Sequence, residues 1–225
     1  MKKAILFLFL LAGTYSVCQA QLYIGGGISY TTNSEGYTEG LSRDNDYSTL
    51  SINPKIGYIF NDRWNAGIYF SFSQNDYKLI SDTNTEDRDY SSWGISPFVR
   101  YTCFSKKGFS LDIDGRLNYT NIHSSSDYEY HPVVDEDKYT LNSTSRTNQY
   151  GISFSPVFVY DFSRHFRIET SLTLFSLSYN DTDYTYTTTR EGSSNQKSEQ
   201  SGFKVSLLGD GHVLNNISLA MVYKF

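Results

Sequence analysis

The chain has 225 residues, with 19 basic and 24 acidic side chains and a formal net charge of −5. This acidic balance, with no basic stripe, argues against nucleic acid as a partner, because binding to phosphates needs clustered Lys and Arg. Tyrosine and phenylalanine occur 20 and 15 times, yet the mean hydropathy is −0.44. Such a combination is typical of a membrane β-barrel, in which only alternate residues of each strand face lipid.

Residues 1–20 are predicted to be a secretory signal peptide. Lys2 and Lys3 form its charged start, residues 4–12 supply the apolar run, and Ala20 ends a cleavage site of small residues. The apolar run is shorter than the roughly 20 residues of a membrane-spanning helix. Cleavage leaves Cys103 as the single cysteine, so no disulfide within the mature chain is expected. We expect residues 21–225 to form one exported domain.

A nine-residue pattern recurs four times along this domain. It reads apolar, Ser or Asn, Pro or Leu, any, apolar, any, Tyr, any, Phe or Cys. Its copies are residues 52–60, 95–103, 154–162 and 217–225. The period of two predicts a β-strand with one apolar face. Because each of the first three copies is followed by a short turn, the pattern predicts four hairpins and therefore eight strands.

In chain order, the first strand is expected at residues 22–30, the second ends at residue 60 and the third begins at residue 64. The fourth and fifth are expected at about 92–104 and at 109–119. The sixth ends at residue 162, the seventh begins at residue 166, and the eighth combines residues 203–207 and 217–225. Gly209-Asp210-Gly211 predicts a bend or bulge within the last strand. Residues 31–47, 74–90, 121–148 and 180–200 are predicted to be long polar loops. Short turns at one end and long loops at the other are typical of bacterial outer-membrane barrels.

The fifth strand has the clearest alternation, with Asp112, Asp114 and Arg116 on the face opposite its apolar residues. A soluble sandwich would not readily bury three charges, whereas a barrel with a polar lumen would. An eight-stranded barrel has a lumen just wide enough to be filled by side chains. We therefore expect the inward charges to pair and plug it, since unpaired buried charges are costly. They are Lys55, Arg100, Asp112, Asp114, Arg116, Glu169 and Lys224.

Aromatic residues gather beside the predicted short turns, as in the interface girdles of membrane barrels. They are Tyr58, Phe60, Trp64, Tyr101, Phe109, Tyr160, Phe162, Phe166, Tyr223 and Phe225. Pro54, Pro97 and Pro156 lie in the middle of predicted strands, where each removes a donor from the ladder. Their equivalent positions predict one repeated accommodation, either a bulge or a gap in the bonding.

With these features the chain resembles the small eight-stranded outer-membrane β-barrel family of Gram-negative bacteria, with its OmpA/OmpX-like and porin-family-like domains. The resemblance implies an all-β, eight-stranded antiparallel up-and-down transmembrane β-barrel over residues 21–225. It also implies location in the outer membrane, contact with outer-membrane lipid, and recognition of the last strand by the barrel-assembly machinery. The residues that match this assembly signal are Ile217, Leu219, Met221, Tyr223 and Phe225.

The leading functional hypothesis is a non-enzymatic structural or adhesive protein that displays four polar loops, with an unidentified surface ligand. One alternative is a lipid-modifying barrel enzyme, for which His123 beside residues 124–126 is the candidate. The other is a soluble secreted barrel that binds a small apolar ligand. No cofactor is expected. No metal site is expected either, because Asp135-Glu136-Asp137 lacks the spaced pattern of a calcium loop.

Tyrosines in the predicted loops leave two interpretations open. Tyrosine is common in recognition surfaces because it combines contact area with a polar tip. It is equally suited to cross-strand pairs in strands that continue above a membrane. The residues concerned are Tyr37, Tyr47, Tyr77, Tyr128, Tyr130, Tyr139, Tyr184 and Tyr186.

Overall fold

The structure is a computed structural model that describes residues 21–37, 43–81, 84–130, 139–188, 195–207 and 217–225. The expected signal peptide, the acidic run at 135–137 and the bend expected at 209–211 lie outside the described residues. Among the described residues there is no helix long and apolar enough to cross a membrane. The elements are the strands β1 (Gln21–Tyr37), β2 (Arg43–Ile59), β3 (Trp64–Ser81), β4 (Asn84–Lys106), β5 (Phe109–Tyr130), β6 (Tyr139–Asp161), β7 (Phe166–Leu172), β8 (Phe175–Thr188), β9 (Asn195–Leu207) and β10 (Ile217–Lys224).

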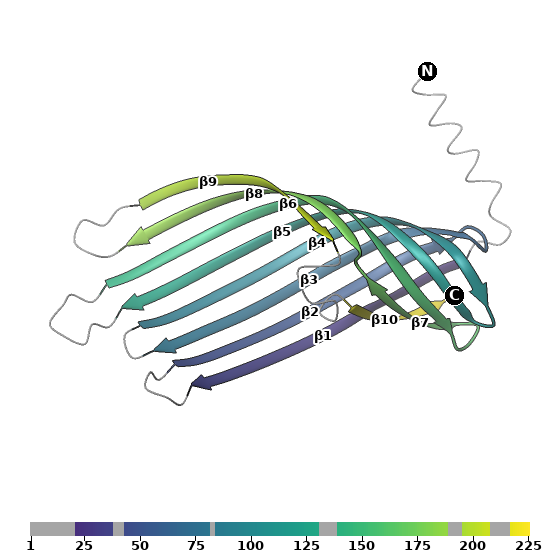
Figure 1. The fold of residues 1–225 in the computed structure, drawn as a ribbon, viewed down its shortest axis with the longest axis horizontal. Coiled ribbons are helices and arrows are strands. Elements are labelled where there is room, and N and C mark those ends of the chain that lie inside the picture. Colours follow the sequence, from purple (N-terminus) through teal and green to yellow (C-terminus); the bar gives the residue numbers. More distant parts are fainter. Residues whose placement is uncertain (1–20, 38–42, 82–83, 131–138, 189–194, 208–216) are drawn as a thin grey trace, which may run out of the picture.

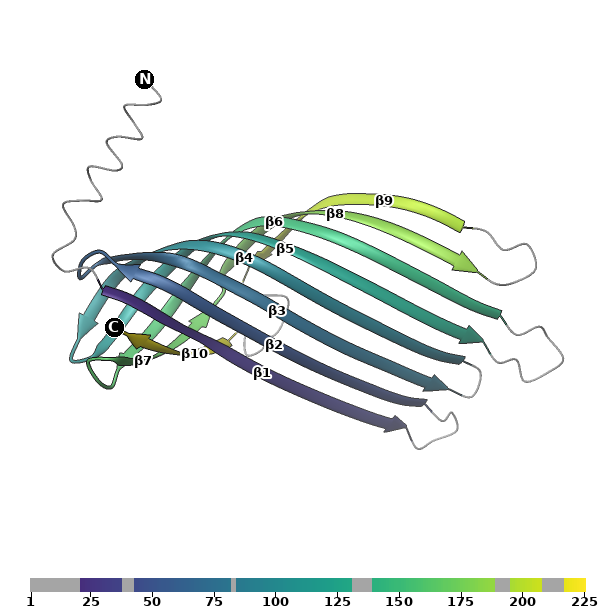
Figure 2. The same ribbon diagram turned by 180° about the vertical axis from the view of Figure 1, so that it is seen from behind.

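Eight antiparallel strands close into a ring at the end that carries the short turns. Around the ring run β1 to β7 in sequence and then β10, which pairs with β7 on one side and β1 on the other. This confirms the predicted eight-stranded antiparallel barrel. Farther along, β8 takes the place of β7 beside β6, and β9 pairs with β8. There the ring gives way to a trough whose edges are β1 and β9 (Figure 1 and Figure 2).

The predicted seventh and eighth strands are each described as two elements. Between β7 and β8 the chain leaves the ladder at Thr173 and Leu174. The faces exchange there, because even-numbered residues such as Phe166 point outward in β7 and odd-numbered ones such as Tyr179 do so in β8. The eighth predicted strand comprises β9 and β10.

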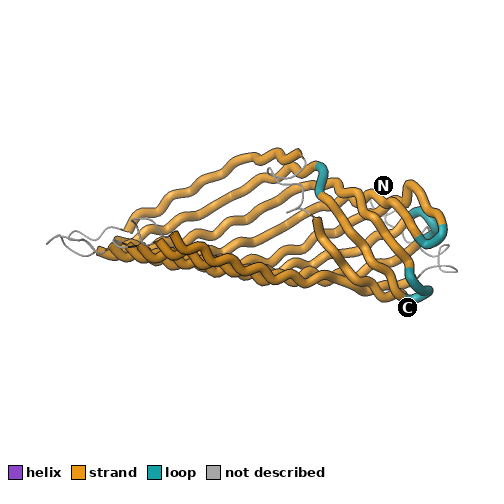
Figure 3. The backbone as a smooth tube through the Cα atoms, turned by 60° about the horizontal axis from the view of Figure 1, so that its bottom comes forward, coloured by secondary structure: helices purple, strands orange, loops and turns teal. Residues whose placement is uncertain are grey.

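The prediction of four long loops is wrong for most of the residues concerned. Strands β4, β5 and β6 have 23, 22 and 23 residues, and β5 pairs with β6 without interruption from Phe109 opposite Tyr160 to Tyr130 opposite Tyr139. Spanning a bilayer takes only about 9–11 residues of a tilted strand. Beyond the membrane both faces of a sheet can be polar, so the apolar alternation disappears from the sequence while the backbone pairing continues. Figure 3 shows these long antiparallel strands running side by side as a trough.

The three prolines share one accommodation, which is a gap in pairing toward the following strand. The β2–β3 ladder omits Asn53 and Pro54, and the β4–β5 ladder omits Ser96 and Pro97. Pro156 falls in the interval where β6 passes from β8 to β7. On the other side each proline stays in register, for example Pro97 opposite Ile68. Each proline, which has no N–H to donate, therefore lies where the ladder toward the following strand is interrupted. Of the two predicted alternatives, a bulge or a gap in the bonding, the structure shows the gap.

Aromatic side chains form two rows on the outer face of the sheet. The lower aromatic row comprises the ten predicted residues, all at the closed end, with contacts such as Phe109–Tyr160 at 4.5 Å between ring centroids. The upper aromatic row was not predicted and consists of Trp93, Tyr119, Tyr150, Tyr179 and Phe203 on five neighbouring strands. Tyr119 follows Phe109 by ten positions. On a tilted strand this corresponds to about 25 Å, the height of the apolar band of outer-membrane barrels.

Large apolar side chains between the two rows point away from the ring. Val99, Ile113, Leu117, Phe154 and Phe158 are all exposed, and Leu117 has 62% of its surface accessible. Most inward residues of the same strands are charged or small, with Phe98 of β4 a buried aromatic exception. This is the reverse of a soluble carrier with an apolar lumen, and it is the arrangement of a strand ring that is surrounded by lipid.

Candidate functional site

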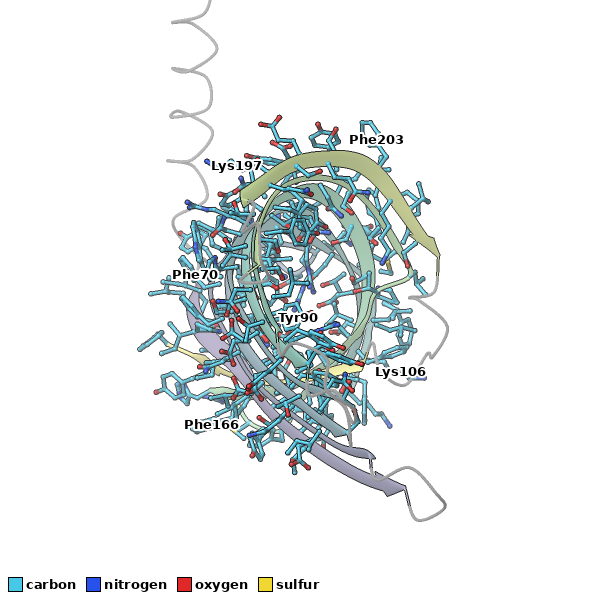
Figure 4. The ribbon with its side chains drawn as sticks, turned by 90° about the vertical axis from the view of Figure 1, so that its left-hand side faces the viewer. Phe70, Tyr90, Lys106, Phe166, Lys197 and Phe203 are labelled. Carbon is cyan, nitrogen blue, oxygen red and sulfur yellow. The ribbon has the colours of Figure 1, made fainter. Side chains whose placement is uncertain are left out.

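The charged residues predicted for the lumen meet inside the ring, in a set that we call the lumen cluster. Five of the seven, Lys55, Arg100, Asp112, Asp114 and Glu169, are at most 3% exposed. Lys224 is 9% exposed, and the Arg116 side chain is 18% exposed. Alternation places them there, because each lies on the face opposite the apolar residues of β2, β4, β5, β7 or β10. Figure 4 looks along the ring that they fill.

Arg100 is the centre of this cluster. Its Nε and Nη2 donate to the two carboxylate oxygens of Asp114, at 2.5 and 3.0 Å. Its Nη1 donates to Oε2 of Glu169 at 2.7 Å and lies 3.9 Å from Oδ2 of Asp112. A guanidinium offers five donors in a rigid fork, so one side chain can bridge several carboxylates. Arg100 therefore connects β4 with β5 and with β7.

Lys55 and Arg116 complete the upper part of the cluster. Lys55 donates from Nζ to Oε2 of Glu169 at 2.5 Å, so this oxygen accepts from two cations. Arg116 Nη2 lies 3.0 Å from Oδ2 of Asp114, and its guanidinium stacks 4.3 Å from the ring centroid of Tyr69. The Tyr69 hydroxyl in turn donates to Asp114 at 3.2 Å. Each buried charge of this group thus has an oppositely charged neighbour.

A lower group joins the predicted Lys224 to two charges that were missing from the predicted set, Arg167 and Asp161. Arg167 donates to both carboxylate oxygens of Asp161 at 2.9 and 3.1 Å, and Lys224 donates to the same carboxylate at 2.8 Å. Arg167 Nη1 lies 4.0 Å from Oε1 of Glu169 and so links the two groups. The sequence could have predicted Arg167 and Asp161 as lumen residues, because the alternation along their strands places both side chains on the inward face.

Aromatic residues seal the lumen beside the charges. Tyr23 and Phe98 are buried with Val222, and the Tyr23 hydroxyl donates to Oδ1 of Asn65 at 3.1 Å. Glycine is required at position 57 because a Cβ there would overlap the ring of Tyr23. Above the cluster remains a cavity of about 250 Å³, which is lined partly by hydroxyl groups such as those of Ser71, Ser96 and Ser171.

The residues considered for catalysis are divided between the two faces of the sheet, with His123 and Ser125 on the outer face. His123 is exposed, and it stands opposite Ser91 and Arg146 of the neighbouring strands. Ser124 and Ser126 point to the inner side of the sheet, because neighbouring residues of a strand face opposite ways. Within the part of the chain that the structure describes, no group of three His, Cys, Asp or Glu side chains could hold a metal ion.

Most of the loop tyrosines lie on strands. Tyr47 stands opposite Tyr77, which is a cross-strand pair, and Tyr130 stands opposite Tyr139. Tyr128, Tyr184 and Tyr186 line a hollow on the inner side of the sheet, together with Tyr90. The side chains of Tyr37 and Tyr139 lie outside the described part. Cross-strand pairing therefore accounts for some of these residues and leaves the group at the hollow to be explained.

The residues that match an assembly signal lie in β10 and at the chain end. Leu219, Met221, Tyr223 and Phe225 all point outward. The side chain of Ile217 is not described. The backbone N–H of Phe225 donates to Leu22 O at 3.0 Å, so the last residue closes the ring against the first strand.

No known protein family and no curated protein matches this chain in sequence. Among solved structures it is similar to the ferric yersiniabactin uptake receptor FyuA of Yersinia pestis, with 14% identity and a TM-score of 0.47 over 83% of this chain and 32% of the receptor. The chain thus spans about a third of that receptor's length. It is also similar to a major outer membrane protein of Thermus thermophilus, with 11% identity and a TM-score of 0.42 over 92% and 100% of the two chains. A third is the attachment invasion locus protein Ail of Yersinia pestis, with 17% identity and a TM-score of 0.34 over 92% and 97%. The fold assignment rests on the strand ring of this chain itself.

Proposed function

We propose that this chain is a non-enzymatic integral outer-membrane protein whose structural or adhesive work is done by the sheet that stands beyond the upper aromatic row. We call this part the outer sheet; it comprises residues 29–37, 43–51, 74–81, 84–92, 120–130, 139–149, 180–188 and 195–202. The observation that carries the proposal is its length. Tyr119 is eleven positions from the end of β5, so the strand continues above the upper row for as far as it runs below it.

The orientation follows from the asymmetry of the connections. At the closed end the strands are joined by short turns, such as residues 60–63 and 107–108. In outer-membrane barrels the short turns face the periplasm and the longer extensions face the outside. The signal peptide predicted from the sequence would direct the chain to that membrane. The outer sheet then stands at the cell surface, where a structural or adhesive protein acts.

The lumen cluster supports a role other than transport through the ring. Its charges come from five strands and interlock across the lumen, with Arg100, Lys55 and Glu169 in direct contact. Paired charges that fill a narrow lumen leave no wide aqueous path. The purified protein in planar bilayers should accordingly show no steady large conductance.

Surface display can be tested with cysteine labelling of intact cells. Asn142 is an exposed residue of the outer sheet, and the free Cys103 is exposed near the closed end. A membrane-impermeant maleimide should label Asn142→Cys on intact cells and should label Cys103 only after the cells are broken. Labelling of Cys103 but not of Asn142→Cys on intact cells would overturn the proposed orientation. If neither Asn142→Cys nor Cys103 is labelled on intact cells, surface display would be overturned.

A further inference from the structure

A hollow of about 280 Å³ lies on the inner side of the outer sheet, between β4, β5, β6 and β8. We call it the inner hollow. The residues that matter for its chemistry are Glu86, Arg88, Ser126, Tyr128, Tyr184 and Tyr186. Figure 4 views the trough from this end, with Tyr90, another residue of its wall, labelled.

The tyrosines of the inner hollow all lie on the inner face of the outer sheet, although water meets both faces of that sheet. On the outer face of the same strands stand exposed acidic residues, among them Asp87, Asp127 and Asp183. On the inner face Tyr184 and Tyr186 stand opposite Ser145 and Ser143, not opposite other aromatic rings. Cross-strand aromatic pairing therefore does not explain them. Concentrated aromatic surface in a concave, water-filled region is the usual mark of a ligand site.

The rings of two of these tyrosines stack on one another. Those of Tyr184 and Tyr186 are nearly parallel, with an interplanar angle of 12° and centroids 6.0 Å apart. Tyr186 is 37% exposed, so part of this surface is open to a ligand. An open aromatic ring face suits a flat apolar face of a ligand, and a phenol hydroxyl can add a polar contact at its rim.

The charges in the hollow cancel each other. Arg88 Nη2 lies 2.5 Å from Oε1 of Glu86, and Ser126 Oγ donates to the same oxygen at 3.4 Å. The hydrogen bond to Glu86 raises the pKa of Arg88, so the guanidinium keeps its positive charge beside that carboxyl group. The remaining polar groups are hydroxyls, for example those of Ser143 and Ser145. Such a lining favours a neutral ligand that is rich in hydroxyl groups.

The backbone of the hollow offers no edge to an extended peptide. Strands β4, β5 and β6 are each paired on both sides at this height, and β8 is paired with β6 and β9. A peptide could not add to the sheet here, because strand addition needs unpaired N–H and C=O groups. Recognition at the hollow must therefore use side chains alone.

We infer that the inner hollow binds a neutral oligosaccharide, with a sugar ring stacked on Tyr184 and Tyr186 and its hydroxyls bonded to Ser126, Arg88 and Glu86. The C–H face of a pyranose is apolar and flat, and its rim carries hydroxyls that both donate and accept. This inference rests on the proposed function, because the hollow must open to the cell exterior to meet such a ligand. It adds the chemical class of that ligand.

The test is a glycan array of neutral and acidic oligosaccharides, probed with the full chain refolded in a detergent that has no sugar headgroup, followed by titration of the best neutral ligand. The variant Tyr184→Ala/Tyr186→Ala should weaken binding by about tenfold or more, as loss of a central aromatic contact does. Ser143→Phe fills the hollow and keeps both tyrosines, and it should weaken binding equally. Tyr30→Ala removes the same type of side chain from the outer face of β1 and should leave binding unchanged.

Heat-modifiable mobility in gels establishes that each variant is folded. Binding of a neutral glycan that both hollow variants lose and Tyr30→Ala retains supports the inference. Binding of no glycan, of acidic glycans only, or of a neutral glycan that the hollow variants still bind would overturn it. Cysteine labelling reads surface display separately, so a displayed sheet that binds no glycan would contradict this inference and leave the proposed function standing.

Discussion

Arg100 of β4 and Glu169 of β7 meet inside the ring, with Nη1 2.7 Å from Oε2, although 69 residues separate them in the chain. The two strands are not neighbours in the ring. Their ion pair therefore connects two strands that are separated by β5 and β6, whereas the backbone ladders connect only adjacent strands. Removing Glu169 leaves buried Lys55 without its carboxylate, and removing Arg100 leaves buried Asp112 without its paired cation.

We expect Arg100→Leu to destabilise the folded barrel by about 3–5 kcal/mol, the usual cost of breaking a buried pair on one side. Asp114 and Glu169 would each lose their main cation. The measurement is urea unfolding in lipid vesicles. Arg146→Leu is the matched control, because Arg146 is exposed on the outer face of β6, and its effect should stay within about 0.5 kcal/mol. Equal midpoints for the two variants would contradict this account of the cluster.

Replacement of a residue between the aromatic rows by lysine should be costly in lipid. Ile113 points outward about midway between the rows, four positions from Phe109 and six from Tyr119, so Ile113→Lys is expected to cost about 2–4 kcal/mol, as charges near the bilayer midplane do. Thr144 is exposed above the upper aromatic row, and Thr144→Lys should be nearly neutral. Unfolding in vesicles measures both. An Ile113→Lys variant as stable as Thr144→Lys would show that this face is not in the membrane.

The proline gaps predict that substitutions at Pro97 and Val99, two positions apart in β4, change the free energy of unfolding by different amounts. Pro97→Ala should change the free energy of unfolding by less than about 1 kcal/mol, because the ladder toward β5 is already interrupted there. Val99 stands opposite both Ala66 and Gly115 in continuous ladders. Val99→Pro should cost about 1–3 kcal/mol, through the lost donor and an unsatisfied acceptor. Equal effects at both positions would refute the gap as the reason for proline.

The sequence predicted the ring well and its upward extension poorly, for one physical reason. In the membrane, lipid on one side and a polar lumen on the other impose a period of two, which located Asp112, Asp114 and Arg116. Beyond the upper aromatic row water meets both faces, so strands such as residues 121–130 read as loops. The upper row itself could have been found, because Tyr119 and Tyr150 lie ten positions from Phe109 and Tyr160 on the outward parity.

Some of the lumen geometry depends on pairings that no local pattern contains. Parity placed Arg100 and Glu169 inside, but their contact requires the register of every strand between them. Arg167 and Asp161 had the right parity and were still left out of the predicted set. The hollow of Tyr184 and Tyr186 depends on where β8 runs beside β6, which follows from the displacement of the chain at Thr173 and Leu174.

The terminal strand offers a prediction about assembly. Phe225 is exposed and bonded only through its backbone to β1, so Phe225→Ala should leave the stability of refolded protein nearly unchanged. If the terminal residues serve as an assembly signal, the same variant should lower the folded fraction recovered from cell membranes. Heat-modifiable gel mobility measures both quantities. Equal folded fractions for Phe225→Ala and the unchanged chain in cells would argue against that role.

The two tryptophans of the chain allow the most direct test of the membrane assignment. Trp64 belongs to the lower aromatic row and Trp93 to the upper one. The measurement is fluorescence quenching in vesicles of lipids brominated at a shallow or a deep acyl position, applied to the single-tryptophan variants Trp93→Phe and Trp64→Phe. The two-row account predicts that both tryptophans are quenched more strongly by shallow than by deep bromines. Deep quenching of either tryptophan, or no quenching of one of them, would contradict a membrane band bounded by these rows.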